Sequence, residues 1–244
     1  MSPLATAARG VFVAATDTGV GKTVLAAALC AALAARGVRV AAFKPALTGL
    51  SEPEPCVPAD HELLASITGQ QPQQIAPTRF GPAVSPHFAA QLAGEVIDVP
   101  AAVASAHALA SHDGFDAVVV EGVGGLLVPL APGWDIRRFA VELGYPVVLA
   151  ARPGLGTINH TLLSLEAARA FGLDVRAVVL TPWSAHRASS IERSNRETIA
   201  ELGGGVPVCV LPRAAALEPA ALAAAAGELP IEQWLSVGSV PGDG

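Results

Sequence analysis

A glycine-rich octet that joins a short apolar run to a long Ala/Leu-rich stretch restricts the fold of this chain more than any other feature. The octet, TDTGVGKT, occupies residues 16–23, after the run VFVAA at 11–15 and at the start of the stretch 22–36. An apolar run without polar alternation predicts a buried strand, and the longer stretch, which ends before Gly37, predicts a helix. A glycine turn between a strand and a helix is the setting of a phosphate-binding loop (P-loop).

The octet also supplies side chains that suit a nucleoside triphosphate and its metal. Its glycines let backbone N–H groups point at phosphate oxygens, and the helix start adds to the attraction for anions. Lys22 would reach the β- and γ-phosphates, and the Thr23 hydroxyl would bind Mg²⁺. The strict pattern asks for glycine at Thr16, so an incidental Gly-rich turn is the alternative. The predicted nucleotide contacts in this segment are Gly19, Val20, Gly21, Lys22, Thr23 and Val24.

Lysine is rare in this chain, which makes its two positions informative. Of 15 basic residues, only Lys22 and Lys44 are lysines. Lysine carries a compact ammonium on a slender stem, whereas arginine is a rigid planar fork. Lys44 follows the second predicted strand, 38–43, which we expect to lie beside the first. A solvated strand-end lysine is the ordinary interpretation, but the scarcity of lysine favours a place for Lys44 facing the γ-phosphate.

Acidic residues mark two further positions that suit a metal. Glu121 ends the apolar run 117–120 and is followed by the glycine turn GVGG at 122–125. Mg²⁺ needs few protein carboxylates beside phosphate oxygens and waters, so Glu121 and one more acid would suffice. Asp60 is the candidate for that second acid, although Glu52, Glu54 and Glu62 nearby leave the choice open. The turn adds Gly122, Val123 and Gly124 to the predicted nucleotide contacts.

The rest of the chain alternates between apolar runs and helical patterns. The predicted helices are 60–68, 101–111, 135–143, 157–171, 188–202 and 219–228, and the further strands are 117–120, 147–151, 175–180 and 206–211. Strands without polar alternation, separated by helices, indicate a parallel sheet covered on both faces. We therefore expect an α/β, P-loop NTPase-like three-layer fold, with a mostly parallel central sheet flanked by helices. Residues 1–244 would form one domain, 50–100 a loop-rich elaboration over the active site, and 229–244 a flexible tail.

Composition argues against several classes of partner. A net charge of −6 and a pI near 5.5 give no basic surface for nucleic acid. The most apolar stretch, 24–35, is about a dozen residues, where a membrane span needs about 20. The first nine residues do not have the pattern of a signal peptide. Three cysteines without metal-ligand spacing fit a reducing cytoplasm.

Two polar segments each allow two interpretations. Ser85 stands in the tripeptide SPH at 85–87, whose histidine is as well explained by a structural role. The sequence GLGTINH at 154–160 joins a strand to a helix, and free N–H groups at that helix start would suit a substrate carboxylate. An ordinary strand–helix connection explains the second segment equally well.

Taken together, these motifs resemble the dethiobiotin synthetase family. They are TDTGVGKT at 16–23, KPxxTG at 44–49, SPH at 85–87, VEGxGG at 120–125 and GTINH at 156–160, within a match over about 11–213. The resemblance implies a cytoplasmic homodimer that makes dethiobiotin from 7,8-diaminononanoate, CO₂ and ATP with Mg²⁺. One amine takes up CO₂ as a carbamate, the carbamate attacks the γ-phosphate, and the second amine displaces phosphate to close a cyclic urea.

The resemblance also implies a role for each residue. Lys22 and Lys44 would be catalytic cations, with the Thr18 hydroxyl near the carbamate, and the metal ligands would be Thr23, Asp60 and Glu121. The implied substrate contacts are Thr48, Ser85, Thr157, Ile158 and Asn159, the last three holding the tail carboxylate across the dimer interface. The nucleotide base would lie near Thr181, Pro182, Leu211, Pro212 and Arg213. The family commonly has glycine at Ala15 and an asparagine in the base loop, where this chain reads LTPW at 180–183, so nucleotide preference stays open.

Two other functions compete on a similar fold. A switch ATPase of the partition or septum-placement type would carry a second lysine early in the phosphate loop. This chain has Asp17 there and no amphipathic membrane helix at its C-terminus. An ATP-dependent amide-forming enzyme of the cobyrinic acid type would need a glutaminase domain, for which 244 residues leave no room.

Overall fold

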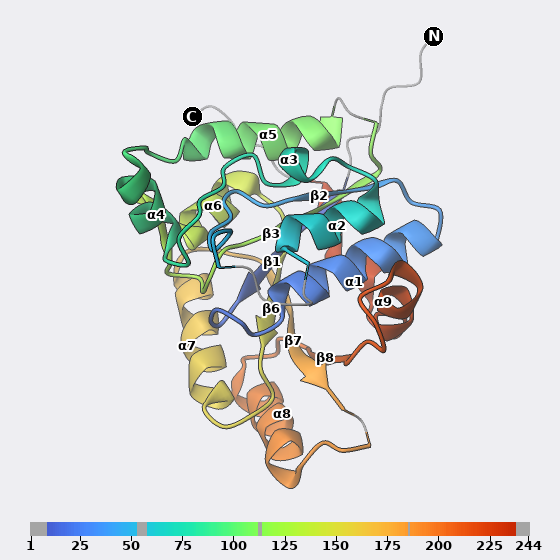
Figure 1. Cartoon of the computed structure of the whole chain (residues 1–244). Helices are drawn as coiled ribbons and strands as arrows, with labels where there is room; N and C mark the ends of the chain where they lie inside the picture. Colours follow the sequence, from blue (N-terminus) through green and yellow to red (C-terminus); the bar gives the residue numbers. More distant parts are fainter. Residues whose placement is uncertain (1–8, 53–57, 112–113, 185, 238–244) are drawn as a thin grey trace.

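A parallel six-stranded sheet forms the middle layer of the protein. The computed structural model describes residues 9–52, 58–111, 114–184 and 186–237. Its strand order is β2-β3-β1-β6-β7-β8 (Figure 1). The short β9 adds an antiparallel pair to β1. The strands are β1 Arg9–Ala15, β2 Val40–Phe43, β3 Ala117–Glu121, β6 Val147–Ala151, β7 Val175–Trp183, β8 Val208–Pro212 and β9 Ser236–Val237.

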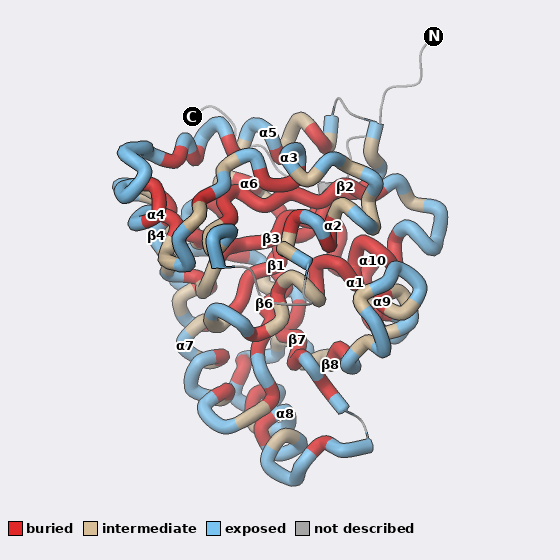
Figure 2. The backbone as a smooth tube through the Cα atoms, viewed as in Figure 1, coloured by how far each residue is buried: buried red, intermediate tan, exposed pale blue. Residues whose placement is uncertain are grey.

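Helices cover both faces of this sheet. On one face pack α1 Lys22–Ala35, α2 Asp60–Thr68, α3 Pro72–Ile75, α9 Pro219–Ala225 and α10 Ile231–Trp234. On the other face pack α4 Pro86–Ala93, α5 Val99–Ser111, α6 Ile136–Leu143, α7 Thr157–Ala170 and α8 Ser190–Leu202. The backbone in Figure 2 shows buried strands between helices whose outer sides are exposed. The predicted three-layer fold is confirmed.

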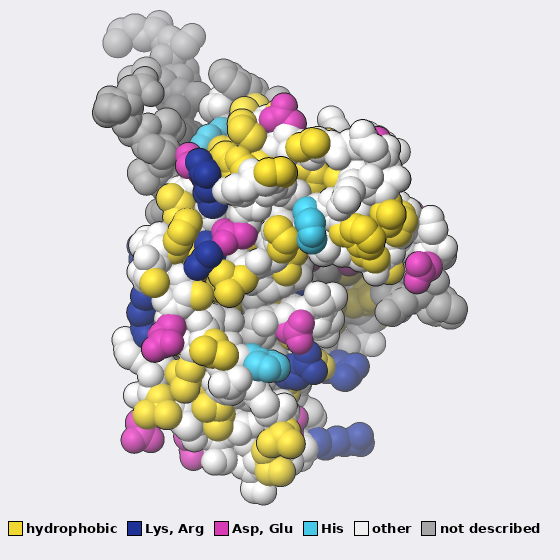
Figure 3. Space-filling model, turned by 90° about the vertical axis from the view of Figure 1, so that its left-hand side faces the viewer, with side chains coloured by type: hydrophobic (Ala, Val, Ile, Leu, Met, Phe, Trp, Pro, Cys, Tyr) yellow, Lys and Arg dark blue, Asp and Glu magenta, His cyan; other side chains and the backbone are white. Residues whose placement is uncertain are grey.

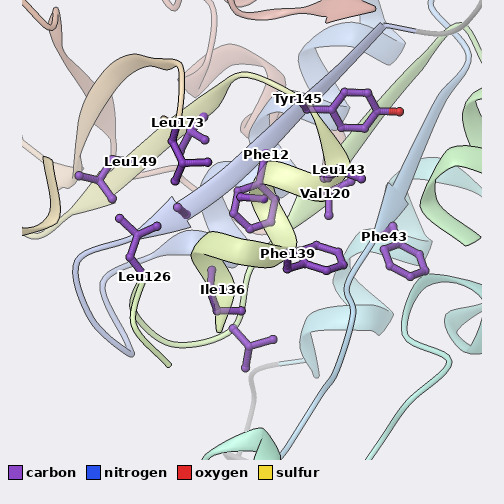
Figure 4. Packing of buried hydrophobic residues seen from close by; sticks show 14 of the residues in the cluster. Phe12, Phe43, Val120, Leu126, Ile136, Phe139, Leu143, Tyr145, Leu149 and Leu173 are labelled. Carbon is purple, nitrogen blue, oxygen red and sulfur yellow. The ribbon is translucent and has the colours of Figure 1, made fainter. Parts of the chain in front are cut away.

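Strand β1 contributes to both cores because its side chains alternate between the two faces. Phe12 lies in the cluster of α5 to α7, where its ring centroid is 5.9 Å from that of Phe139 (Figure 4). Val11 and Val13 lie in the opposite cluster, against α1. All three β1 residues are fully buried, so the strand that precedes the phosphate loop is held from both sides.

The strand order differs from the sequence prediction in one respect that matters for the site. We expected β2 beside β1, but β3 lies between them and pairs in parallel with both. Lys44 therefore approaches the phosphate loop across the end of β3, where Glu121 lies. Strand order depends on long-range packing, which local patterns do not encode.

Several elements were missed or misplaced by the sequence analysis. The 50–100 segment holds α2 at its predicted bounds but also α3 and α4. A small hairpin, β4 Pro129–Ala131 and β5 Trp134–Asp135, was not predicted because its strands are too short to show alternation. Strand β7 continues three residues past its predicted end, through residues assigned to the base loop.

The predicted flexible tail is wrong for residues 229–237. That segment forms α10 and β9, and Trp234 is only 3% exposed. Ile231 and Leu235 are buried with it, so three large apolar side chains fix a segment whose Gly, Pro and Ser content resembles a tail. Residues 238–244 lie outside the described residues. Within the described ranges, no helix has the length and apolar character to cross a membrane.

Candidate active site

A cavity of about 730 Å³ opens at the carboxyl ends of β1, β2 and β3. Its walls come from the phosphate loop, residues 47–52 and 58–60, residues 83–86 and the turn after β3. It brings together thirteen predicted site residues: Thr18, Gly19, Gly21, Lys22, Thr23, Val24, Lys44, Thr48, Asp60, Ser85, Glu121, Val123 and Gly124. These positions span residues 18–124, so the parallel strands gather distant segments at one edge of the sheet.

The phosphate loop has the backbone that its glycines predict. Gly19 and Gly21 adopt left-handed conformations, with φ of 71° and 98°, and α1 begins directly after Gly21. The described side chains provide no cap for this helix start. The loop and the first turn of α1 thus offer backbone N–H groups to an anion.

Gly21→Ala is expected to weaken ATP binding strongly and to cost about 1–2 kcal/mol in backbone strain. A Cβ at Gly21 would lie 3.0 Å from Thr181 Cγ2, a tight contact that would also press on the Thr181 side chain. Gly37→Ala is the matched control, because Gly37 has a φ of 80° but nothing within 4 Å of an added Cβ. Calorimetry should find reduced ATP affinity in the first variant and normal affinity in the second. Equal affinities would show that the loop conformation is not needed for binding.

Lys44 lies at the centre of a buried polar cluster with Asp60, Glu121 and Thr23. Its Nζ is 2.5 Å from Asp60 Oδ2 and 2.8 Å from Glu121 Oε1, and its side chain is only 4% exposed. The Thr23 hydroxyl donates to the same Glu121 oxygen at 2.8 Å. Asp60 thus contacts Lys44, whereas Glu54, one of the alternative acids, lies outside the described residues.

The pKa of each charged group in this cluster depends on burial and on the charges of the other groups. Burial acts to lower the pKa of Lys44, but the charges of Glu121 and Asp60 outweigh it and raise the pKa. Burial raises the pKa of the Glu121 carboxyl, against the opposing charge of Lys44. For Asp60 burial is outweighed, and Lys44 lowers its pKa. Lys44 thus stays charged in the interior, where a fixed cation acts strongly on nearby anions.

The buried charge of Lys22 is less well balanced by nearby carboxylates than that of Lys44. Its Nζ donates to the Asp17 carbonyl oxygen at 3.1 Å, and the residue is 7% exposed. Burial lowers its pKa to about 8, with Glu121 acting in the opposite direction. Burying the charged form of Lys22 therefore lowers the free energy of unfolding. This loss of stability is present below pH 8 and disappears as pH rises toward 10.5, the ordinary pKa of lysine.

ATP affinity is expected to fall as pH rises from 8 to 9, by at most about tenfold per pH unit. Above pH 8 the free protein holds Lys22 mostly neutral, and the phosphates must recharge it by taking up a proton. Calorimetry in two buffers with different ionisation enthalpies should detect that proton uptake at pH 9. Lys22→Met should bind ATP weakly at every pH. Unchanged affinity with no proton uptake would contradict the assignment of Lys22.

The residues around Lys44 fit a hard divalent cation. Thr23, Asp60 and Glu121 offer oxygen ligands of the type that Mg²⁺ prefers. Glu121 Oε2 is buried and lacks a hydrogen-bond partner among the described residues, so one carboxylate oxygen is uncommitted. The described ranges contain no group of three or more His, Cys, Asp or Glu suited to a metal. The cluster has only two such residues, and Mg²⁺ bound with phosphate needs no more.

The predicted base contacts do not line the cavity. Thr181 lies against Gly21 behind the phosphate loop, and Leu211 is fully buried in the core. Pro212 and Arg213 are exposed, and the Arg213 N–H donates to the Trp183 carbonyl oxygen. Pro182 is exposed on β7 between two buried residues. The base site stays a prediction.

The predicted tail-carboxylate residues also lie outside the cavity. Thr157 is buried, and its hydroxyl is 3.4 Å from that of Thr161. Its N–H donates to the Gly154 carbonyl oxygen, so one of the expected free donors is occupied. Ile158 packs against the core and Asn159 is exposed.

Two predicted nucleotide contacts near the phosphate loop also do not line the cavity. Val20 is buried, and the Gly122 N–H donates to the Val13 carbonyl oxygen of β1.

The apolar wall of the cavity, and the pairing of chain segments that forms it, were not predicted from the sequence. The wall includes Leu47, Leu50, Val84 and Val128. It forms because residues 47–51 run alongside 78–82, with an isolated parallel bridge between Leu47 and Arg79. No local pattern gives that pairing.

The fold and this site define a P-loop nucleotide-binding protein, and the chain matches the family described as "AAA domain" over residues 9–221. The ATP-dependent dethiobiotin synthetase BioD of Haloferax mediterranei is 39% identical over 225 residues, covering 92% of this chain and 93% of that relative. The enzyme of the same name from Anaeromyxobacter dehalogenans strain 2CP-1 is 42% identical over 206 residues, covering 84% and 90%. The chain belongs to the dethiobiotin synthetase family.

Solved structures with a similar fold are more distant in sequence. The cell division ATPase MinD of Pyrococcus furiosus has a TM-score of 0.50 and 22% identity, covering 84% of this chain and 83% of that chain. A ParA family ATPase from Chlorobium tepidum has a TM-score of 0.53 and 14% identity, covering 93% and 96%. At these identities the likeness concerns the fold alone.

Proposed function

We propose that this chain catalyses ATP-dependent closure of 7,8-diaminononanoate and CO₂ to dethiobiotin. The observation that carries the proposal is that two buried lysines, Lys22 and Lys44, line one cavity together with the phosphate loop and several apolar side chains. An aliphatic diamine with a carboxylate tail matches a cavity whose wall includes Leu47, Leu50 and Val84. A cytoplasmic location is part of the same proposal.

The residues of the cavity suit a reaction between two anions. An amine of the substrate and CO₂ form a carbamate, releasing a proton, and a carbamate oxygen then attacks the γ-phosphorus as ADP leaves. Lys22 and Lys44 place positive charge where negative charge accumulates in this transfer, which is the main means by which proteins accelerate it. The Thr18 hydroxyl, at the cavity wall, would hydrogen-bond the carbamate. The second amine then attacks the carbonyl carbon, and phosphate leaves.

Thr23, Asp60 and Glu121 would hold Mg²⁺. When bound, the metal would neutralise charge on the phosphate oxygens. The chain's own part is to hold the buried Glu121 carboxyl against Lys44, and to keep the Thr23 hydroxyl turned toward the same carboxyl oxygen. Thr48 and Ser85 lie on the cavity wall and would contact the substrate.

The proposal includes a homodimer with a substrate site at its interface. Figure 3 shows apolar side chains on the face that carries α4 and α7. The exposed apolar residues of this part of the chain include Leu92 on α4, Leu163 on α7 and Leu155, which is 92% exposed. Leu155 lies two residues before Thr157, the first residue of α7, so an apolar contact there would place the proposed tail-carboxylate residues at the interface.

The test is to incubate the protein with 7,8-diaminononanoate, bicarbonate, Mg²⁺ and ATP and to detect dethiobiotin by mass. The proposal expects one dethiobiotin per ADP formed, and no product when the diamine or the nucleotide is omitted. Absence of product, together with ATPase activity stimulated by a partner protein, would instead support a switch ATPase.

A further inference from the structure

Asp17, the second residue of the octet, accepts a hydrogen bond at each of its three oxygens. Its Oδ1 accepts the N–H of Thr18 at 2.7 Å, and its Oδ2 accepts from Arg152 Nη2 at 3.0 Å. Its carbonyl oxygen accepts from Lys22 Nζ at 3.1 Å. Asp17 therefore contacts Thr18 and Lys22, two residues that the proposed reaction uses, and is itself tied to Arg152.

Side-chain packing does little to hold the turn that follows Asp17. Thr18 and Gly19 are both exposed, and a Cβ added to Gly19 would meet no described atom within 4 Å. The peptide group between Asp17 and Thr18 is instead held at both ends, because its N–H donates to Asp17 Oδ1 and its carbonyl oxygen accepts from Lys22. When Lys22 turns to the phosphates of ATP, as the proposed reaction requires, the bond to the carboxylate is the one of these two that remains.

The sheet fixes the place of Arg152 relative to the phosphate loop. Arg152 directly follows β6, whose Ala150 pairs with Ala15 of β1, and the Thr16 N–H donates to the Ala150 carbonyl oxygen at 3.0 Å. Arg152 and Asp17 thus extend from adjacent parallel strands at one edge of the sheet. Because both main chains are already ordered there, pairing costs mainly the entropy of the two side chains.

We propose that Arg152 is a positioning residue: by holding the Asp17 carboxylate, it fixes the peptide group of Thr18 and so directs the Thr18 hydroxyl at the carbamate. The inference rests on the proposed function, in which that hydroxyl bonds the carbamate. Arg152, Asp17 and Thr18 belong to one chain and to one edge of its sheet, so no distance across a dimer interface enters. Because the carbamate must meet the γ-phosphorus in one orientation, loss of direction at Thr18 lowers turnover more than ATP affinity.

Arg152→Ala is expected to lower kcat about two- to fivefold, the range for loss of a half-exposed ion pair, and to change the Kd for ATP less than about twofold. Arg152→Lys keeps a cation within reach of Asp17 and should retain most of the wild-type kcat. Arg176→Ala is the matched control, because it removes another exposed arginine–aspartate pair, in which Arg176 Nη2 is 2.7 Å from Asp174 Oδ2. It should leave kcat unchanged.

A double-mutant cycle with Thr18→Val shows whether Arg152 acts through the Thr18 hydroxyl. Thr18→Val removes the hydroxyl at nearly constant shape and should lower kcat about tenfold or more. In the Thr18→Val background, Arg152→Ala should lower kcat by less than about 1.5-fold, because no hydroxyl remains to be directed. A two- to fivefold loss that persists in that background, or an equal loss in Arg176→Ala, would overturn the inference.

Failure of the inference can be told apart from failure of the proposed function. If the wild-type protein makes dethiobiotin and Thr18→Val lowers kcat but Arg152→Ala does not, only the role of Arg152 is overturned. If Thr18→Val keeps the wild-type kcat, the proposed carbamate contact is wrong and the role of Arg152 is overturned with it. If the wild-type protein makes no dethiobiotin, the proposed function itself is wrong. Losses in both single variants that do not multiply in the double variant support the inference.

Discussion

Replacing Lys44 by arginine is expected to reduce turnover about 100- to 1,000-fold while ATP still binds. The substitution preserves charge but not shape, because arginine is a planar fork and lysine a point charge. Lys44 Nζ sits between Asp60 Oδ2 and Glu121 Oε1 on a side chain that is only 4% exposed. A guanidinium cannot keep both contacts in that space, so the cation would leave the position that we propose for it beside the γ-phosphate.

The measurements are kcat at saturating substrates and ATP affinity by calorimetry. Arg39→Lys is the matched control, a swap between the same two residue types at an exposed pair with Asp116. It should leave both quantities unchanged. Near-normal turnover of Lys44→Arg would remove Lys44 from the mechanism.

Glu121→Gln is expected to lower turnover about 100-fold or more and to raise the Mg²⁺ concentration needed for half-maximal rate about tenfold or more. The carboxylate accepts from both Lys44 and Thr23 through one oxygen, and its other oxygen is buried with no hydrogen-bond partner in the part of the chain that the structure describes. Glutamine keeps the size but removes the charge that offsets Lys44 and attracts a cation. Titrating the rate against Mg²⁺ at fixed ATP measures both effects.

Glu52→Gln provides the comparison for Glu121→Gln. Glu52 is an exposed acid on the wall of the same cavity, and the hydrogen bonds of the Lys44 cluster within the described ranges do not involve it. Its neutralisation should leave the Mg²⁺ requirement as it is, because an exposed charge is strongly screened. An unchanged Mg²⁺ requirement in Glu121→Gln would contradict its assignment as a metal ligand.

The fold and the part of the candidate site formed by the phosphate loop, Lys44 and Glu121 could be predicted, because their signals are local in sequence. The octet at 16–23 fixes a turn between β1 and α1, and strands without polar alternation predict a sheet buried on both faces. Lys44 and Glu121 lie where strands end, and such ends share one edge in a parallel sheet. Asp60 needed the family resemblance, because its acidic neighbours offered the same chemistry.

The remaining features depend on contacts between distant segments. Leu47 joins the cavity wall only because its segment runs alongside residues 78–82. Arg152 reaches Asp17 from 135 residues away, and an arginine directly after a predicted strand gives no sequence signal of that contact. The Gly, Pro and Ser content of the C-terminal residues is typical of a tail, and a single tryptophan, Trp234, does not change that prediction. In the structure its large side chain is buried, which fixes the segment around it.

The most direct test of the central claim follows oxygen atoms from CO₂. Carbamate attack on the γ-phosphate transfers one CO₂ oxygen to phosphate and leaves the other in the ureido carbonyl. With ¹⁸O-labelled CO₂, sampled before exchange with water, we expect one ¹⁸O in inorganic phosphate for each ¹⁸O-labelled dethiobiotin. Phosphate without label would contradict it, because ATP would then have been cleaved without an attack by the carbamate.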